Sequence, residues 1–459
     1  MNDPQLGWFG DRRRAATGDA LLAAMQSKQT MCLHALADDR NQARRFGGFL
    51  DHASVSRHEM LVRAGQLTAR RAAGRHVLAV ADTTELNFAA HTGRKRGFGT
   101  VGNGKDIGVL LHPVVAVDAE HGGILGLVGA EVINRPPGKA KDHKTRDADE
   151  KESRRWLAGA ETAGDVLAEA ASVTVVEDRE GDCFDQFGRR PDNVHLLVRA
   201  AQNRSAAGGG KLFDICAGWP EAGRTTIEVP AKHGKGQRAA RTAVVAVRFG
   251  EVTLTRPATA GKTLPKQLTV RVVDVREVHA ADDPVHWCLL TTHAVGTPAE
   301  AMQIVTWYRM RWNIEQVFRT LKTDGMDAET SQIATPNRLL KLAIVALIAA
   351  IRVMQLVNGR DGSTGQPLSD VIEDPAEVPA LMAIDTTLEG RTRKLKNPYD
   401  PASLAWYAWI AARLGGWSGY TSSGYKPPGP KIMARGLKRL DAMVKGFMLA
   451  NHSALPGLP

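Results

Sequence analysis

The feature that most constrains the fold is a change of sequence periodicity at His76. Before it, residues 1–75 carry helical patterns such as DALLAAMQ and NQARRFGGFL. After it come short apolar runs with period two, which are typical of strands. Three such runs, separated by glycine-rich turns, predict an antiparallel meander: HVLAVADTTELNF, GVLLHPVVAVD and ILGLVGAEVINR.

The chain then alternates helical and strand-like segments. A charged stretch over 146–171 predicts an amphipathic helix and leads into the strand-like SVTVVEDREGD and VHLLVRAAQN. Three strands, a helix and further strands predict an α/β fold that is not the repeated βαβ of a doubly wound sheet. Residues 199–280 add three strand-like runs, TTIEVPA, RTAVVAVRFGEVTLT and KQLTVRVVDVREV. Helices are predicted over 298–322, over 337–358 and in a C-terminal group that follows a Gly/Pro/Asp-rich linker.

The distribution of charge suggests a polyanionic partner. The 459 residues include 60 Lys and Arg against 49 Asp and Glu, a net charge of +11 that also suits a basic protein with no nucleic-acid role. Residues 199–280 hold 14 basic and 6 acidic residues, and residues 1–75 hold 12 and 7. These two regions contribute +8 and +5, which leaves about −2 for the rest. Nucleic acid is therefore expected along these two regions, although solvated helix faces explain the N-terminal charge equally well.

The cysteines and apolar segments indicate the compartment. The four cysteines form no C-x-x-C pair, which argues against a zinc ribbon and a disulfide framework: Cys32, Cys183, Cys216 and Cys288. The N-terminus lacks the apolar region of a signal peptide. The apolar segment 339–357 contains Lys341 and Arg352, so a buried core helix is preferred over a membrane span. We expect a cytoplasmic protein in a reducing compartment, with no membrane partner.

A glycine motif at Gly97, Gly99 and Gly102 fits G-x-G-x-x-G. The dinucleotide-binding fingerprint requires a strand before the motif and a helix after it. Here the motif follows HTGRKR and precedes a strand-like run. A hairpin loop is the better interpretation, and no nucleotide cofactor is expected.

Two acidic residues end apolar runs. Asp82 follows VLAVA and Asp178 follows VTVVE. Strand ends are where an α/β sheet presents side chains to a site, although either residue alone is more often a turn or cap residue. Together they raise the possibility of a shared divalent cation, because Mg²⁺ prefers carboxylate and phosphate oxygens.

The predicted helix over 298–322 carries one polar stripe. At about 100° per residue, Tyr308, Arg311, Glu315 and Lys322 fall within about 60° of one another, beside an apolar face. A carboxylate, two cations and a phenol in this position suit a helix that lines a phosphate-and-metal cleft. The competing interpretation is a solvated face with an Arg311/Glu315 pair at i,i+4.

The spacing Tyr308-x2-Arg311-x3-Glu315-x6-Lys322 resembles the Y-R-E-K signature of bacterial DDE transposases of the insertion-sequence-four type. The likeness extends over most of the chain: GDRRR, FLDHASVS, ADTTELNF, EDREGD, HLLVRA, HWCLLTT, LGGW, KPPGP and RGLKRL. It implies an RNase H-like α/β core interrupted by a β-strand insertion, with helical domains at both ends. The implied domains are DNA-end binding over 1–75, core over 76–204, insertion over 205–285, core over 286–358, linker over 359–396 and dimerisation over 397–459.

The resemblance also implies the site. Asp82, Asp178 and Glu315 would be the catalytic carboxylates and would hold two Mg²⁺ ions, for which Mn²⁺ can substitute. Tyr308, Arg311 and Lys322 would bind phosphates around a flipped nucleotide. Trp287 matches a base-stacking tryptophan, against the alternative of a core residue, and Arg199 and Arg204 match backbone-contacting arginines.

The implied activity is cut-and-paste transposition by a homodimer that holds two transposon ends and joins them to target DNA after a hairpin step. An RNase H-like nuclease or resolvase would use the same carboxylates without making a hairpin. A catalytically inactive regulator would bind DNA and cut nothing. The basic loop HGKGQRAAR is a further candidate for tracking DNA, from composition alone.

Overall fold

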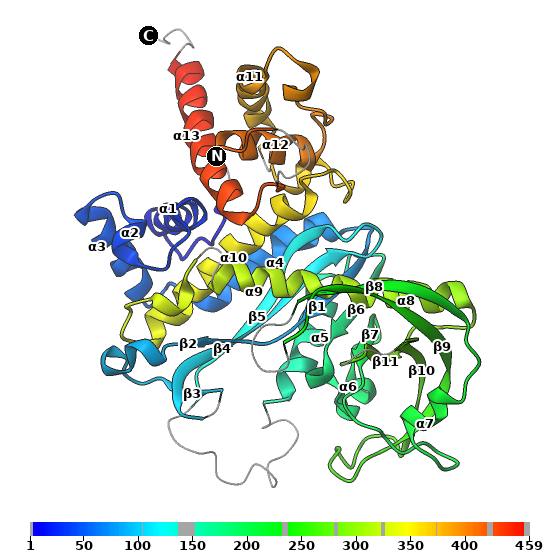
Figure 1. The fold of residues 1–459 in the computed structure, drawn as a ribbon. Helices are drawn as coiled ribbons and strands as arrows, with labels where there is room; N and C mark the ends of the chain where they lie inside the picture. The colour runs from blue at the N-terminus through cyan, green and yellow to red at the C-terminus, as the bar shows by residue number, and fades with distance from the viewer. Residues whose placement is uncertain are drawn as a thin grey trace. The chain divides into compact units, whose positions relative to one another are not determined.

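The computed structural model describes residues 3–102, 104–135, 152–231, 237–279, 283–322, 326–372, 374–419 and 426–453. It divides the chain into two compact units (Figure 1). The first comprises Met1–Ala73, Thr83–Lys139 and Asn313–Pro459, and the second comprises Gly74–Asp82 and Ala140–Trp312. The predicted N-terminal and C-terminal helical regions therefore belong to one compact unit.

The first unit begins with four helices, as the helical pattern of residues 1–75 predicts. They are α1 (Arg12–Lys28), α2 (Leu33–Leu36), α3 (Arg40–Asp51) and α4 (Arg57–Ala72). Asp11, Asp39 and Ser56 cap α1, α3 and α4, each accepting a hydrogen bond from a first-turn N–H group. These caps fix where the helices start, so the polar residues before each apolar pattern are structural.

The strands of the first unit all pair with one long strand. These are β2 (Thr84–Asn87), β3 (Gly99–Val101) and β5 (Ile124–Ile133), each antiparallel to β4 (Asp106–Asp118). The glycine motif contains β3, which confirms the hairpin interpretation. The run HVLAVADTTELNF, expected as one segment of the meander, instead forms two strands, of which β1 (His76–Ala81) belongs to the second unit.

Helix α10 (Pro336–Gly359) is the core helix of the first unit, as predicted. It alone among the described helices is long and apolar enough to cross a membrane, and 83% of its most apolar window is buried inside the protein. Both charged residues of its apolar segment 339–357 have internal partners. Lys341 donates to the carbonyls of Leu50 and His52, at 2.8 and 3.1 Å, and Arg352 donates to the Val371 carbonyl. The charges that argued against a membrane span thus anchor α10 to neighbouring segments.

The C-terminal helices of the first unit form a second apolar core. They are α11 (Val378–Leu388), α12 (Leu404–Leu414) and α13 (Pro430–Ser453). Helix α11 lies inside 359–396, which composition had marked as a linker. It is ordered by packing on α12, where Trp406 donates its indole N–H to Asp385 at 2.8 Å. The segment expected to be a linker thus contains a helix.

Close packing of α13 on α12 predicts opposite effects for two glycines of α13. A Cβ at Gly436 would lie 1.7 Å from the Ala411 carbonyl oxygen, whereas a Cβ at Gly446 meets nothing within 4 Å. Gly436→Ala should destabilise the protein by about 1–3 kcal/mol through overpacking. Gly446→Ala should stabilise it by up to about 1 kcal/mol through helix propensity. Urea unfolding of both variants checks this, and equal effects would contradict the packing described.

The second unit contains a mixed sheet. Its strand order is β1, β6 (Ser172–Glu177), β7 (Val194–Arg199), β11 (His286–Thr291), β10 (Gln267–Glu277), β9 (Arg241–Thr255) and β8 (Gly223–Val229). Strands β1, β6 and β7 are parallel, and the remaining neighbours are antiparallel. The alternating runs of residues 199–280 thus become β8, β9 and β10. A mixed sheet with helices fits an RNase H-like α/β protein.

The helices of the second unit are α5 (Arg154–Val166), α6 (Phe184–Arg189), α7 (Leu212–Ala217) and α8 (Pro298–Met310). Helix α5 packs on β1, β6 and β7, and α8 packs on β9 and β10. Helix α5 is shorter than the predicted helix over 146–171, whose first six residues lie outside the described part. The predicted helix over 298–322 is not continuous, because it breaks at Arg311 into α8 and α9 (Trp312–Lys322), and α9 belongs mostly to the first unit.

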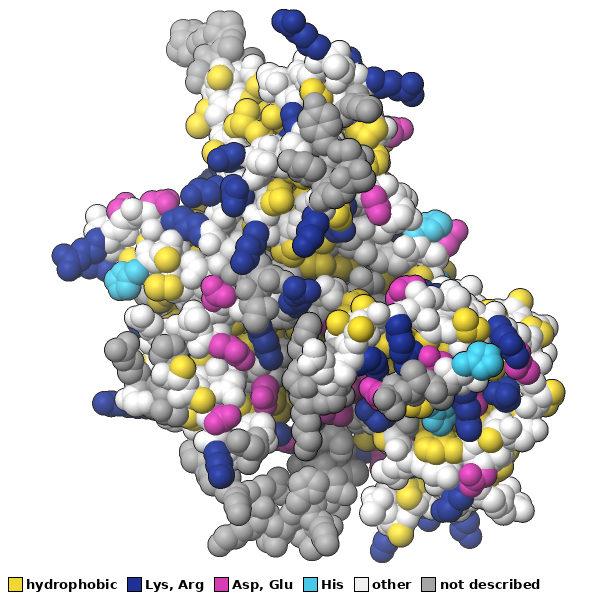
Figure 2. All heavy atoms as spheres, in the orientation of Figure 1, with side chains coloured by type: hydrophobic (Ala, Val, Ile, Leu, Met, Phe, Trp, Pro, Cys, Tyr) yellow, Lys and Arg dark blue, Asp and Glu magenta, His cyan; other side chains and the backbone are white. Residues whose placement is uncertain are grey.

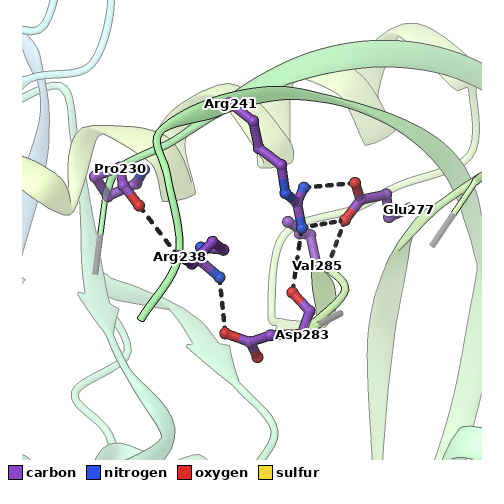
Figure 3. A network of polar contacts seen from close by, with 6 residues as sticks. All are labelled: Pro230, Arg238, Arg241, Glu277, Asp283 and Val285. Carbon is purple, nitrogen blue, oxygen red and sulfur yellow. Dashed lines mark hydrogen bonds and ion pairs between the residues drawn. The ribbon is translucent and has the colours of Figure 1, made fainter. Parts of the chain in front are cut away.

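Carboxylates hold two arginines of the predicted basic loop (Figure 3). Arg241 makes two hydrogen bonds with Glu277, at 2.5 and 2.9 Å, and Arg238 pairs with Asp283 at 2.8 Å. The second Glu277 oxygen also accepts the Val285 N–H at 2.9 Å. These arginines fasten β9 to the turn before β11. The part of HGKGQRAAR over 233–236 lies outside the described residues.

Three histidines, His76, His195 and His293, form a cluster with Thr174 of β6. The Thr174 hydroxyl lies 2.8 Å from Nε2 of His76 and 2.7 Å from Nε2 of His293. The His195 ring stacks on His293 at 4.0 Å between centroids. Burial, together with the smaller effects of the neighbouring His195 and His76, lowers the pKa of His293 to about 3. The folded protein therefore favours a neutral His293.

This cluster predicts acid sensitivity. The unfolded chain protonates His293 near its ordinary pKa of 6.5, whereas the folded chain does so near 3. The contribution of His293 to stability is thus complete above about pH 6.5 and is lost as the pH falls from there towards 3. The urea midpoint should fall between pH 7 and pH 5, and it should fall less in His293→Asn. An equal fall in the variant would show that other groups dominate.

Candidate active site

Two parallel strands bring Asp82 and Asp178 to one edge of the sheet. The register pairs Val80 of β1 with Val176 of β6, so each aspartate lies two residues beyond this pair on its own strand. Paired strands lie about 4.8 Å apart, which is close enough for both carboxylates to contact one cation. Both residues are only partly buried, so their oxygens reach the surface at this edge.

A tight turn fixes Asp178. Its carboxylate accepts the Glu180 N–H at 2.8 Å and caps the short helix η3 (Arg179–Gly181). A Cβ at Gly181 would lie 2.1 Å from Oε2 of Glu177, so glycine is required in this turn. The side chain of Asp178 is therefore held where β6 ends.

Sequence reasoning missed Glu177, which lies directly before Asp178. Its side chain is fully buried, and its Oε1 accepts a hydrogen bond from Gln186 at 2.7 Å. Burial raises the pKa of Glu177 well above its usual range, and the charges of Asp178 and Asp82 raise it further. The Glu177 side chain packs against Gly181 in this turn. The sequence EDREGD alone does not indicate which of its acids is buried.

Asp82 is paired with an arginine of the predicted signature. Arg311 donates from Nη1 to Oδ2 of Asp82 at 2.8 Å, and the two side chains are 16% and 15% exposed. Arg311 lies at the break between α8 and α9, where its N–H bonds to the Tyr308 carbonyl at 3.1 Å. The break thus directs this guanidinium at a predicted metal ligand rather than along a continuous polar stripe.

Arg204 has a structural partner instead of the predicted DNA-contacting position. Its Nε and Nη2 donate to Oδ1 of Asp182 at 3.1 and 2.7 Å, and the side chains are 7% and 0% exposed. Asp182 also accepts the N–H groups of Ala201 and Gln202. Through these contacts Asp182 joins the segment after β7 to the turn that holds Asp178. The Nε and Nη2 donors of Arg204 are used within the protein.

Tyr308, Trp287 and Arg199 form one cluster in the second unit. The rings of Trp287 and Tyr308 meet edge to face with centroids 5.1 Å apart. Tyr308 is 5% exposed, and burial raises its pKa, against the effect of the cations Arg311 and Arg199. Arg199 lies close enough to Tyr308 to oppose the rise in its pKa, and it donates to the His286 carbonyl at 2.7 Å. Trp287 is only partly buried, at the start of β11, so it is not a fully enclosed core residue.

A buried aspartate that the sequence did not reveal holds the start of β11. Asp274 is fully buried and accepts hydrogen bonds from Arg276 at 2.8 Å and from His286 at 3.0 Å. Arg276 also donates to the Phe213 carbonyl at 2.9 Å. Because Trp287 follows His286 directly, this network fixes the strand from which Trp287 projects.

Glu315 and Lys322 lie on α9, and both belong to the first unit. Lys322 Nζ is 3.9 Å from Oε1 of Glu329, and the same oxygen accepts the Asn87 N–H at 3.0 Å. The structure thus assembles Asp82, Asp178, Arg311, Tyr308, Trp287 and Arg199 within the second unit. It assigns the other two signature residues to the first.

The donor chemistry at the strand edge suits a hard divalent cation. Asp82 and Asp178 offer carboxylate oxygens, the ligands that Mg²⁺ and Mn²⁺ prefer. Within the described part of the chain, no three His, Cys, Asp or Glu side chains converge closely enough to enclose a metal ion. The two aspartates alone therefore offer fewer ligands than such a cation takes, and any site here would need further oxygens.

Residues 73–352 match the sequence model of the family described as "Transposase DDE domain". This region covers more than half of the chain and includes both strand-end aspartates, the insertion and the signature helices. The chain belongs to the DDE transposase family. It is accordingly a DNA-binding transposase, a metal-dependent enzyme that cleaves DNA.

Breaking the buried Asp182–Arg204 pair should lower the stability of the fold. Asp182→Asn leaves a buried guanidinium without its counter-ion and should cost about 3–5 kcal/mol. Glu161→Gln, at the more exposed Arg154–Glu161 pair, should cost less than about 1 kcal/mol. Urea unfolding measures both changes. If Asp182→Asn unfolded like the parent, the structural role of Arg204 would be wrong.

Proposed function

We propose that the protein is a cut-and-paste transposase of the insertion-sequence-four type, which excises a DNA segment and joins its 3′ ends to target DNA. The observation that carries this proposal is the placement of Asp82 and Asp178 at the ends of neighbouring parallel strands, inside the matched domain. The spacing of Tyr308, Arg311, Glu315 and Lys322 supports the assignment to this type.

We propose that Asp82, Asp178 and Glu315 together hold two Mg²⁺ ions, with Mn²⁺ as a substitute. Bound there, the ions would activate the attacking oxygen and stabilise the leaving oxygen of an in-line phosphodiester transfer. The chain's own contribution is positional. The turn at Glu180 and Gly181 orients Asp178, and β1 orients Asp82. Glu315 would complete the set from the first turn of α9.

Trp287 and Tyr308 are proposed to receive a base that leaves the stack when the transposon end closes into a hairpin. A partly exposed indole beside a buried phenol provides an aromatic surface for such a base. Arg199 would support this surface by holding Tyr308 and the His286 carbonyl. Lys322 would contact a phosphate once DNA replaces its contact with Glu329.

The proposed DNA path follows exposed cations. On α3, Arg40, Arg44 and Arg45 are exposed, which supports end binding by residues 1–75. Figure 2 shows Lys and Arg side chains over the strands of the insertion, interspersed with acidic ones. We further propose that a homodimer holds two ends, with the C-terminal helices over 397–459 forming the subunit contact.

Removal of a catalytic carboxylate should abolish cleavage without abolishing DNA binding. With Mg²⁺ and DNA from the flanks of the coding region, Glu315→Gln and Asp82→Asn should each lower the rate of strand cleavage by more than about a hundredfold, because a direct metal ligand matters more than an outer-shell partner. Gel electrophoresis of labelled DNA measures the cleavage.

The matched control for this experiment is Glu180→Gln, an exposed acid in the Asp178 turn that pairs with Arg155. It should cleave within a few-fold of the parent. The proposal would be abandoned if the parent cut none of the supplied DNA, or if Glu315→Gln cut as fast as the parent. A product lacking hairpins would point instead to a simple nuclease.

A further inference from the structure

We infer that Arg311 acts as an internal counter-ion that keeps metal off Asp82 until DNA arrives, so that metal binding and DNA binding are coupled. The inference rests on the proposed function, because it takes Asp82 as a metal ligand. It adds a role for Arg311 that phosphate binding alone does not include. The observation behind it is the short contact between Arg311 Nη1 and Asp82 Oδ2, at 2.8 Å.

The contact opposes a cation at the same oxygen. A guanidinium stays protonated in proteins, so Arg311 carries a full positive charge beside Oδ2. A Mg²⁺ ion binds carboxylate oxygen at about 2.1 Å. Added to the 2.8 Å contact, this places the ion at most about 5 Å from the guanidinium nitrogen. Both side chains are mostly buried, at 16% and 15% exposed, so water screens this repulsion poorly.

A DNA phosphate would offer Arg311 a better partner. Burial lowers the pKa of Arg199, and the charges of Arg179 and Arg311 also act on Arg199 to lower it. Three cations therefore lie close together in this part of the site. Phosphate oxygens accept two parallel hydrogen bonds from a guanidinium. The exchange moves Arg311 from Asp82 to phosphate and leaves the carboxylate open to metal.

The position of Arg311 in the chain suits such an exchange. It lies between α8 and α9, where the α-helical hydrogen-bond pattern is interrupted. Its own N–H bonds to the carbonyl three residues earlier, at Tyr308. By reciprocity, metal bound at Asp82 would also strengthen the binding of DNA.

The test measures Mn²⁺ binding to the full chain without DNA, from the electron paramagnetic resonance signal of free Mn²⁺. The neutral variants Arg311→Gln and Arg311→Ala should bind Mn²⁺ about tenfold more tightly than the parent, a typical size for coupling between sites. Arg311→Lys, which keeps the charge, should stay near the parent. Arg309→Gln, which removes an exposed cation from α8, should change the affinity less than twofold. Thermal melts establish that each variant is folded.

One further variant distinguishes failure of this inference from failure of the proposed function. Asp82→Asn should lose the Mn²⁺ site. If it does, and both neutral Arg311 variants bind Mn²⁺ no more tightly than the parent, the inference is wrong while the proposed metal site stands. If Asp82→Asn binds Mn²⁺ like the parent, Asp82 is no metal ligand, and both proposals fail at this residue.

The coupling to DNA has its own readout. Fluorescence anisotropy with a labelled 40-base-pair duplex should show that Mn²⁺ tightens DNA binding by the parent and does so less for Arg311→Gln. An equal effect of Mn²⁺ on both proteins would contradict the exchange of partners. This measurement needs no cleavage, so a catalytically weak protein can still be tested.

Discussion

The parallel pairing of β1 with β6 is the interaction on which the site depends. It joins residues almost a hundred positions apart, and its backbone hydrogen bonds set the register that places Asp82 beside Asp178. A one-residue slip would turn every side chain of β6 to the other face of the sheet. Buried apolar side chains from Val77 to Ala81 and at Val173, Val175 and Val176, together with the hydrogen bond between Thr174 and His76, oppose such a slip. The geometry of the carboxylates is therefore a consequence of core packing.

Sequence periodicity predicted the elements whose burial follows a regular pattern. The run RTAVVAVRFGEVTLT coincides with β9, and the helix predicted over 337–358 differs from α10 by one residue at each end. The break at Arg311 could not be predicted, because the apolar spacing continues through it. The guanidinium contact with Asp82, 229 positions away, coincides with that break. Helix α11 was not predicted either. Its apolar residues pack on α12, a contact between distant segments that the local sequence does not reveal.

Net charge by segment overstates the positive surface offered to DNA. Residues 199–280 contribute +8, yet two of their arginines pair with carboxylates outside this segment, Arg204 with Asp182 and Arg238 with Asp283. Other arginines pair with carboxylates inside it. Arg241 is held by Glu277, Arg271 by Glu251 and Arg276 by Asp274. These pairs stabilise the long antiparallel strands, so composition locates the basic region but does not identify which cations face a phosphate.

The acids around the site differ in burial, which separates those that hold the fold together from those whose carboxylates are accessible. In EDREGD, Glu177 and Asp182 are buried and bonded to Gln186 and Arg204, while Asp178 is partly exposed at the strand edge. Within the string nothing distinguishes them, because the partners come from residues further along the chain. The buried Asp182 accepts backbone N–H groups and so fixes the chain around it, whereas a carboxylate at an open edge can exchange partners. Asp82 lies between these two cases, because its carboxylate is partly exposed and is paired with the Arg311 guanidinium at 2.8 Å.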